Sequence, residues 1–498
     1  MRKPFISLIL IVLVGLTACT ASNGEGAGIT VAIPADPDGF HPHHSVAAAS
    51  AEIAFNIYEG LVKAGADGSV QPALAEEWSI SADGLTYEFT LRPDIMFHNG
   101  RPLEAEDVIH SLGRLFDEEV TAKAREFAAV DTLEAAGDKI IITLSRPDAA
   151  FLALLTEFGA SIYPREAEEQ LDTRPVGTGP FVLTDWQPNN RLELTRFEHY
   201  WQDGLPLLDT VTLQIIPDPN TAVTNLRTGH VDLIPRLEPD YMHQVEEEPG
   251  LKFVEGPMNL VQLLAINNAR EPFDNLLVRQ AINYAIDREE IIEGAAWGYG
   301  TMVGTNLSPA MGEWYNPEVD EIYSYSPEKA RELLAEAGYA DGFSAVLHLP
   351  APYPLHINAG QILAHQLEQV GIELSLEIIE WSTWLEQIYQ NRDFELTVIG
   401  FTGKLDPHSI IGRYQSDSSR NLNNFDNDEY DSLIRQGLEA TDPAERQEIY
   451  RQVQEILALD AAAAFIMDPN QIAVMAGDIE GWQNYPVYVL DLAALSRR

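Results

Sequence analysis

The most informative segment of the chain runs from Leu74 to Leu112 and reads LAEEWSISADGLTYEFTLRPDIMFHNGRPLEAEDVIHSL. Apolar residues alternate with polar ones in Trp78–Ile80 and Leu85–Leu91, which is the period of a half-buried strand, and the SADG between them predicts a tight hairpin turn. FHNG predicts a second turn. The acidic residues of 104–107 favour the start of a helix, because carboxylates stabilise the positive end of the helix dipole. The stretch therefore predicts a hairpin, a turn and a helix.

This sequence segment resembles family 5 of the bacterial extracellular solute-binding proteins, which includes the dipeptide-, oligopeptide- and nickel-binding receptors of ABC importers. The residues that carry the resemblance are Trp78, Asp83-Gly84, Leu91-Arg92, Phe97, Gly100 and Ala105-Glu106-Asp107. Three other segments also match the family, reading NIYEGL (56–61), VGTGPF (176–181) and VRQAINYAIDREEI (278–291). The resemblance thus reaches both halves of the chain.

The resemblance implies an α/β protein with the type 2 periplasmic-binding-protein fold, in which two lobes with mixed sheets surround a ligand cleft. Residues 29–260 with 485–498 would form the first lobe and 261–484 the second. An extra α+β domain would be inserted in the first lobe at about residues 50–175. The residue patterns agree, since strand and helix signals alternate along the chain and indicate an open mixed sheet. One of these helices is predicted over Ala47–Leu61, where Ile53, Ile57 and Leu61 recur every four residues.

The N-terminus has the layout of a secretory signal. Arg2 and Lys3 precede an apolar run from Phe5 to Leu16, which is shorter than the roughly 20 residues that span a bilayer. The run ends in LTAC, which resembles the lipobox of a bacterial lipoprotein. We therefore predict a signal peptide over residues 1–18, lipid attachment at Cys19 and a flexible tether over residues 19–28.

Composition narrows the function classes. The chain has 498 residues and 45% hydrophobic content, enough for a large core that splits into domains. It has 31 Lys plus Arg against 77 Asp plus Glu, a net charge of −46, which would repel nucleic acid. The acidic residues are scattered, which favours a solvated surface and predicts a monomer; a site for cationic ligands is the alternative. A single cysteine excludes a disulfide framework and a multi-cysteine metal site.

Catalytic motifs are missing. We find no GxSxG, HExxH, GxxxxGK[ST] or strand-linked GxGxxG. Paired carboxylates carry little information in so acidic a chain. We therefore predict no catalytic residue, no cofactor and no enzymatic activity.

The stretch expected to select the ligand is IGFTGKLDP at residues 399–407. It resembles the segment in which peptide-binding relatives place an acidic residue that pairs with the ligand's α-amino group. Here Lys404 takes the aligned position, which would favour an anionic group, whereas Asp406 would serve an amine if the loop shifts; Lys404 as an exposed loop lysine is the alternative. Phe401 and Thr402 are candidate contacts from the same stretch.

Other candidate contacts come from separate segments. Phe40 and His43 lie where the family's chain crosses the base of the cleft, Asn267 ends a predicted strand of the second lobe, and Trp384 is a candidate stacking wall. Imidazoles at 41, 43 and 44 raise a metal hypothesis, but neighbouring residues of an extended chain point to opposite sides. We therefore predict no metal site.

The resemblance implies a lipid-anchored extracytoplasmic receptor that captures a small solute between two lobes and delivers it to an ABC permease and its ATPase. A peptide is the leading ligand class. An oligosaccharide, an opine-like compound or a nickel–metallophore complex is the alternative, and a secreted hydrolase or a chemoreceptor on the same fold is a more distant one.

Overall fold

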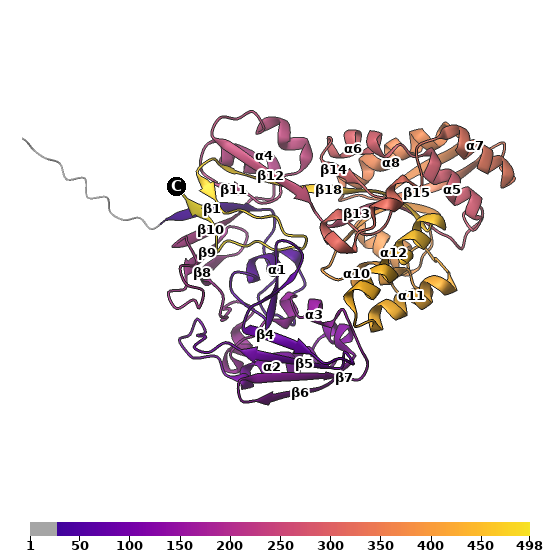
Figure 1. The fold of residues 1–498 in the computed structure, drawn as a ribbon. Coiled ribbons are helices and arrows are strands. Elements are labelled where there is room, and N and C mark those ends of the chain that lie inside the picture. Colours follow the sequence, from indigo (N-terminus) through magenta and orange to yellow (C-terminus); the bar gives the residue numbers. More distant parts are fainter. Residues whose placement is uncertain (1–26) are drawn as a thin grey trace, which may run out of the picture.

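The computed structural model describes residues 27–498. The predicted signal peptide, Cys19 and nearly all of the predicted tether lie outside the described residues. Within the described part of the chain, no helix has both the length and the apolar composition needed to cross a bilayer. Figure 1 shows two lobes side by side, with a further group of strands below the first lobe.

One large mixed sheet of twelve described strands runs through both lobes in the order β16-β15-β17-β13-β18-β11-β1-β10-β9-β8, with β12 and β14 also paired to β18. Its first-lobe strands are β1 (Gly28–Ile33), β8 (Phe181–Gln187), β9 (Arg191–Arg196), β10 (Thr210–Ile215), β11 (Leu233–Ile234) and β12 (Leu251–Pro257). Its second-lobe strands are β13 (Leu260–Ile266), β14 (Gly300–Met302), β15 (Phe343–Pro350), β16 (Ile372–Ile379) and β17 (Leu396–Thr402). The fourteen-residue strand β18 (Ala463–Ala476) belongs to both lobes.

Helices cover both faces of the sheet in the second lobe. Alternate residues of β13 enter different cores, with Leu264 and Ile266 on one face and Val261, Leu263 and Ala265 on the other. A strand that is buried on both faces has apolar side chains on both sides, which explains why LVQLLAI is apolar at every position except Gln262. The covering helices are α5 (Leu276–Ala285), α6 (Arg288–Ala296), α7 (Pro327–Glu336), α8 (Pro354–Glu368), α9 (Trp381–Thr383), α10 (Pro407–Ile411), α11 (Asp428–Glu439) and α12 (Pro443–Leu459).

The stretch from Leu74 to Leu112 folds as its sequence predicts. β4 (Ala75–Ile80) and β5 (Thr86–Leu91) pair antiparallel across a turn in which Gly84 has a φ of +70°. Asp107 accepts a hydrogen bond from the backbone N–H of Glu104 and closes the capping box of α2 (Ala105–Leu115). β7 (Lys139–Leu144) and β6 (Val130–Ala136) complete a separate sheet in the order β4-β5-β7-β6.

The remaining α-helices and strands of the described chain are short. They are α1 (Ala48–Ala54), α3 (Phe151–Leu154), α4 (Pro219–Arg227), β2 (Val62–Ala64), β3 (Val70–Pro72), β19 (Ile479–Glu480) and β20 (Ser496–Arg497). We call β2–β7 with α2 and α3 the inserted domain, which lies within residues 50–175 and has its own apolar core. In Figure 1 it is the lower group of strands.

The helix predicted over Ala47–Leu61 is wrong in length, because α1 ends at Ala54. The backbone carbonyls of Asn56 and Ile57 instead accept hydrogen bonds from the N–H groups of Phe181 and Gly179. A Cβ at Gly179 would lie 2.7 Å from the carbonyl oxygen of Asn56, so the glycines of VGTGPF permit this close approach.

The boundary between the lobes lies inside β18. Ala463–Met467 pairs with β13 of the second lobe, whereas Asn470–Ala476 pairs with β12 of the first. The chain therefore returns to the first lobe inside β18, before the predicted residue 485. Both ends of β18 are apolar and mostly buried, whereas DPNQ (468–471) interrupts the apolar run at the crossing.

Candidate ligand-binding cleft

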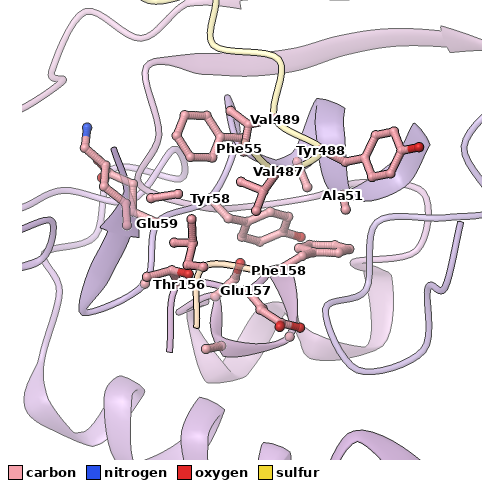
Figure 2. Close-up of a pocket in the computed structure, with 18 of the residues that line it drawn as sticks. Ala51, Phe55, Tyr58, Glu59, Thr156, Glu157, Phe158, Val487, Tyr488 and Val489 are labelled. Carbon is pink, nitrogen blue, oxygen red and sulfur yellow. The ribbon is translucent and has the colours of Figure 1, made fainter. Parts of the chain in front are cut away.

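A cavity of about 490 Å³ lies where the first lobe, the inserted domain and the second lobe meet. Its apolar walls come from α1, from the residues after α3 and from the C-terminal segment, and they include Ala51, Phe55, Tyr58, Phe158, Val487 and Val489. Figure 2 shows these side chains around one hollow, with Glu157 and Tyr488 at its edge. A cavity of this size with mainly apolar walls and a few charged groups is typical of a small-molecule site.

An ion pair crosses this cavity from lobe to lobe. Lys404 of the second lobe donates from Nζ to Oε1 of Glu157 in the inserted domain at 2.7 Å. The two side chains are 45% and 35% exposed. Both residues line the cavity, so a ligand that enters can reach either charge.

Lys123 and Glu126 line the same end of the cavity. Nζ of Lys123 donates to the carbonyl oxygen of Ser45 at 3.0 Å and to that of Pro42 at 2.5 Å. Burial lowers the pKa of Lys123. Burial and then the nearby Glu157 carboxylate raise the pKa of Glu126. Opposite charges on both sides of the cleft therefore balance one another at this end.

Glu59 is a fully hydrogen-bonded carboxyl group at the cavity wall. It accepts from Tyr200 Oη at 3.0 Å, from Trp201 Nε1 at 2.9 Å and from Thr178 Oγ1 at 2.9 Å. Burial raises the pKa of Glu59, and Lys63 beside it opposes the shift. The bond from Thr178 holds VGTGPF against NIYEGL, and the bonds from Tyr200 and Trp201 add a third segment, so Glu59 has a structural role.

Among the residues predicted from the sequence, Thr402, Lys404 and Asp406 line the cavity. Asp406, however, already has partners for both carboxylate oxygens, because Arg446 donates to each at 2.8 Å. Oδ1 also caps α10 by accepting from the N–H of His408 at 2.9 Å. The buried pair fixes the loop, and the Arg446 guanidinium already provides the counter-charge that a ligand amine would otherwise supply to Asp406.

The other predicted contacts lie outside the cavity. Phe40 is fully buried and packs edge-on against Trp186 at 5.4 Å. Asn267 is buried too, and its side chain donates to the carbonyl of Phe394 at 2.8 Å. Phe401 lies under the guanidinium of Arg413, whose Cζ is 3.6 Å from the ring centroid.

Trp384 and His43 also belong to packed interiors. Trp384 is 1% exposed and donates from Nε1 to Thr397 Oγ1 at 3.0 Å, with Trp381 stacked on it. His43 is buried next to Tyr163, and neither ring nitrogen has a hydrogen-bond partner in residues 27–498. Burial lowers the pKa of His43 to about 3, so the ring is neutral. No group of three or more potential metal ligands occurs in the described chain.

Asn259 is buried behind the loop that lines the cleft, and the sequence did not single it out. It has a φ of +56° between β12 and β13, and its Nδ2 donates to the carbonyl of Pro486 at 2.8 Å and to that of Lys404 at 3.2 Å. Its own carbonyl accepts from the N–H of Gly403. Asn259 thus joins the crossing between the lobes to the loop that contains Lys404. Asparagine tolerates this conformation better than most residues, which is a weak signal.

A second cavity, of about 480 Å³, lies between the inserted domain and the second lobe. The β4–β5 turn and Pro147–Leu152 form one side, and Trp314 with the α11–α12 connection forms the other. The N–H of Ala149 donates to the carbonyl of Leu438 at 2.9 Å beside it. The inserted domain is therefore in direct contact with the second lobe.

Comparisons with known proteins agree with this architecture. The family model described as bacterial extracellular solute-binding proteins, family 5 Middle, matches residues 69–421. Heme-binding protein A of Haemophilus influenzae is 32% identical over 457 residues, which cover 84% of this chain and 82% of that protein. The chain belongs to family 5 of the bacterial extracellular solute-binding proteins.

Two further relatives of this family-5 chain are peptide-binding proteins. The dipeptide-binding protein of Escherichia coli is 28% identical over 487 residues, with 90% of each chain covered. The periplasmic binding protein DppA of Helicobacter pylori, solved with the peptide STSA, is 26% identical with a TM-score of 0.79, covering 95% of this chain and 98% of that one. The predicted α/β class and the type 2 periplasmic-binding-protein fold are confirmed.

Proposed function

We propose that this chain captures a small peptide between its two lobes and delivers it to an ABC permease. The observation that carries the proposal is the interlobe cavity, whose apolar walls end in charged groups of both signs. A peptide offers the complementary chemistry, since its side chains suit an apolar wall and its termini are charged. Support also comes from relatives that bind a dipeptide and the peptide STSA.

Burial between lobes suits a transport receptor. A ligand held by both lobes is shielded from water, which strengthens its polar contacts, and it favours the arrangement in which the lobes are close. A permease that recognises this arrangement distinguishes a loaded receptor from an empty one. The proposal gives the chain a binding role without catalysis, acting as a monomer.

We also propose that the receptor is a lipoprotein held at the outer face of a membrane through Cys19. The LTAC sequence supports this anchor, and its thiol is the single one in the chain. Cells grown with an alkyne-tagged palmitate should label the wild type and leave Cys19→Ala unlabelled. Label on the Cys19→Ala protein would contradict the assignment.

The ligand class is tested on the full-length receptor purified in mild detergent. The protein is incubated with a pool of di-, tri- and tetrapeptides, separated from free pool and examined by native mass spectrometry. We expect retained peptides at a stoichiometry of one. Retention of an oligosaccharide, an opine-like compound or a nickel–metallophore complex from parallel pools, with no peptide retained, would overturn the peptide assignment and leave the receptor role in place.

A further inference from the structure

The ion pair between Lys404 and Glu157 joins the second lobe to the inserted domain at the cavity. Both side chains line the cavity, and each has hydrogen-bonding capacity beyond the single contact at 2.7 Å. An accessible ion pair of this kind contributes little to stability, because water and salt screen its charges. A ligand can therefore exchange with one of its members.

We propose that Glu157 binds the free α-amino group of the ligand and that this ammonium takes the place of the Lys404 side chain. The inference rests on the proposed capture of peptides and adds the residue that selects their amino terminus. The anionic partner of the ligand would thus come from the inserted domain, on the opposite side of the cleft from the loop of residues 399–407.

The surroundings of Glu157 favour a cation over an anion. Phe158 is the next residue in the chain, and its ring already lies 5.5 Å from the ammonium of Lys123. Tyr58 packs near Phe158, with 6.0 Å between the ring centroids. Aromatic faces attract cations and repel anions, so these two walls suit an ammonium group. Figure 2 shows Tyr58, Glu157 and Phe158 together at the cavity.

The local charge balance permits the exchange. The strongest charge effects on Lys123 and Glu126, including their effects on one another, come from three carboxylates and three cations, namely Asp38, Glu126, Glu157, Lys123, Lys404 and Arg420. If a ligand ammonium replaces the ammonium of Lys404, this balance stays the same. Lys404 is the member free to leave, because its long flexible stem is 45% exposed and can turn into solvent. The net charge of −46 attracts cationic groups in the same sense.

The other cation at this end is not available for exchange. Lys123 donates to the carbonyl oxygens of Pro42 and Ser45, which tie it to the segment before α1. Its removal would leave two carbonyl groups without their donor. Lys404 is therefore the single mobile cation among the described residues that contact Glu157 through a hydrogen bond.

The two members of the pair should respond in opposite directions. The probe is the tripeptide most strongly retained from the pool, and binding is measured by calorimetry for its free and N-acetylated forms. We expect Glu157→Gln to weaken binding of the free peptide at least tenfold and Glu157→Asp to restore part of it. Lys404→Met should increase affinity, because the ligand ammonium no longer competes with the Lys404 side chain for Glu157. Acetylation should weaken binding to the wild type at least tenfold and have little further effect in Glu157→Gln.

Controls separate this contact from general effects. Lys329 and Glu332 form an exposed ion pair within α7, so Lys329→Met and Glu332→Gln remove the same charges away from the cleft and should leave affinity unchanged. Equal loss in Glu157→Gln and Lys404→Met would show a purely structural pair and overturn the proposal. Loss in Lys404→Met alone would assign the site to an anionic group instead. If free and acetylated peptides bind equally well, the proposed peptide function is kept and the proposed role of Glu157 is wrong. If no peptide binds, both proposals are wrong.

Discussion

At the scale of single residues, the loop of residues 399–407 is positioned by buried polar contacts. Asp406 and Arg446 are 6% and 7% exposed and form two parallel hydrogen bonds. The guanidinium of Arg446 also donates to the carbonyl of Gly437 at 2.9 Å and lies 5.1 Å from the ring centroid of Trp314. Such a pair fixes geometry, because a loop that moves would leave a charge buried without a partner.

Removal of one member should therefore destabilise the receptor strongly. We expect Arg446→Met to lower the free energy of unfolding by about 3–5 kcal/mol, since Asp406 would remain buried without its counter-charge. Urea denaturation followed by circular dichroism measures the change. Arg435→Met on the exposed side of α11 is the control and should change the value by less than about 0.5 kcal/mol. Equal effects of the two substitutions would contradict the assigned role of the pair.

Gly403 offers a second test at this scale. A Cβ at this position would lie 2.0 Å from Oδ1 of Asn259, which is too close for any real contact. Gly403→Ala should displace Asn259 and the backbone of Lys404 that it holds, and we expect peptide affinity to fall by about tenfold. Gly113→Ala on α2, where nothing lies within 4 Å of the added Cβ, should leave affinity unchanged. Unchanged affinity in Gly403→Ala would show that the loop does not depend on Asn259.

At the scale of elements, the described chain passes between the two lobes in β18 and in the connection between β12 and β13. Both passages lie next to one buried carboxyl group. Asp468 accepts from the N–H groups of Met258 at 3.0 Å and Asn259 at 3.1 Å, and from the hydroxyl of Ser308. The carboxyl group thus connects one crossing to the other. A pair of strands joined in this way can bend together, which suits a hinge between rigid lobes.

The protonation of Asp468 should affect stability. Burial raises its pKa to about 6 from an ordinary value of 3.8, although its hydrogen bonds oppose the shift. The folded state therefore holds this proton more tightly than the unfolded chain does. The stabilisation is complete below about pH 4 and is lost as the pH rises through about 6, a change of about 3 kcal/mol.

The comparison of wild type with Asp468→Asn isolates this effect, because the amide does not titrate. We expect the free energy of unfolding of the wild type to fall relative to that of the variant between pH 4 and pH 7. Any offset caused by the amide group itself is the same at every pH. Denaturation curves at four pH values measure the difference, and a difference that stays constant would contradict the raised pKa.

At the scale of the whole molecule, the sequence predicted what depends on neighbouring residues. The hairpin, turn and helix of Leu74–Leu112 follow from local alternation, turn residues and a capping box, so they were found correctly. The end of α1 was missed, because Asn56 and Ile57 bond to a segment more than a hundred residues away. The crossing inside β18 was missed, although DPNQ (468–471) separates the two apolar halves of the strand at that point.

At the cleft, too, the sequence predicted local features and missed contacts between distant residues. The sequence pointed to the loop that contains Lys404 through a resemblance, and that loop does line the cavity. The partners of its charges were out of reach, since Glu157 is 247 residues from Lys404 and Arg446 is 40 residues from Asp406. From sequence alone, an aromatic residue such as Trp384 is equally compatible with a cavity wall and with the core, and only the fold distinguishes the two.

A crystal structure of the receptor grown with the retained tripeptide would show whether the peptide binds between the lobes. We expect peptide density between α1, the inserted domain and the loop of residues 399–407, with the peptide's α-amino nitrogen about 3 Å from the Glu157 carboxylate. Density in the second cavity beside Trp314, or a peptide in the cleft with its amino terminus pointing away from Glu157, would contradict this expectation.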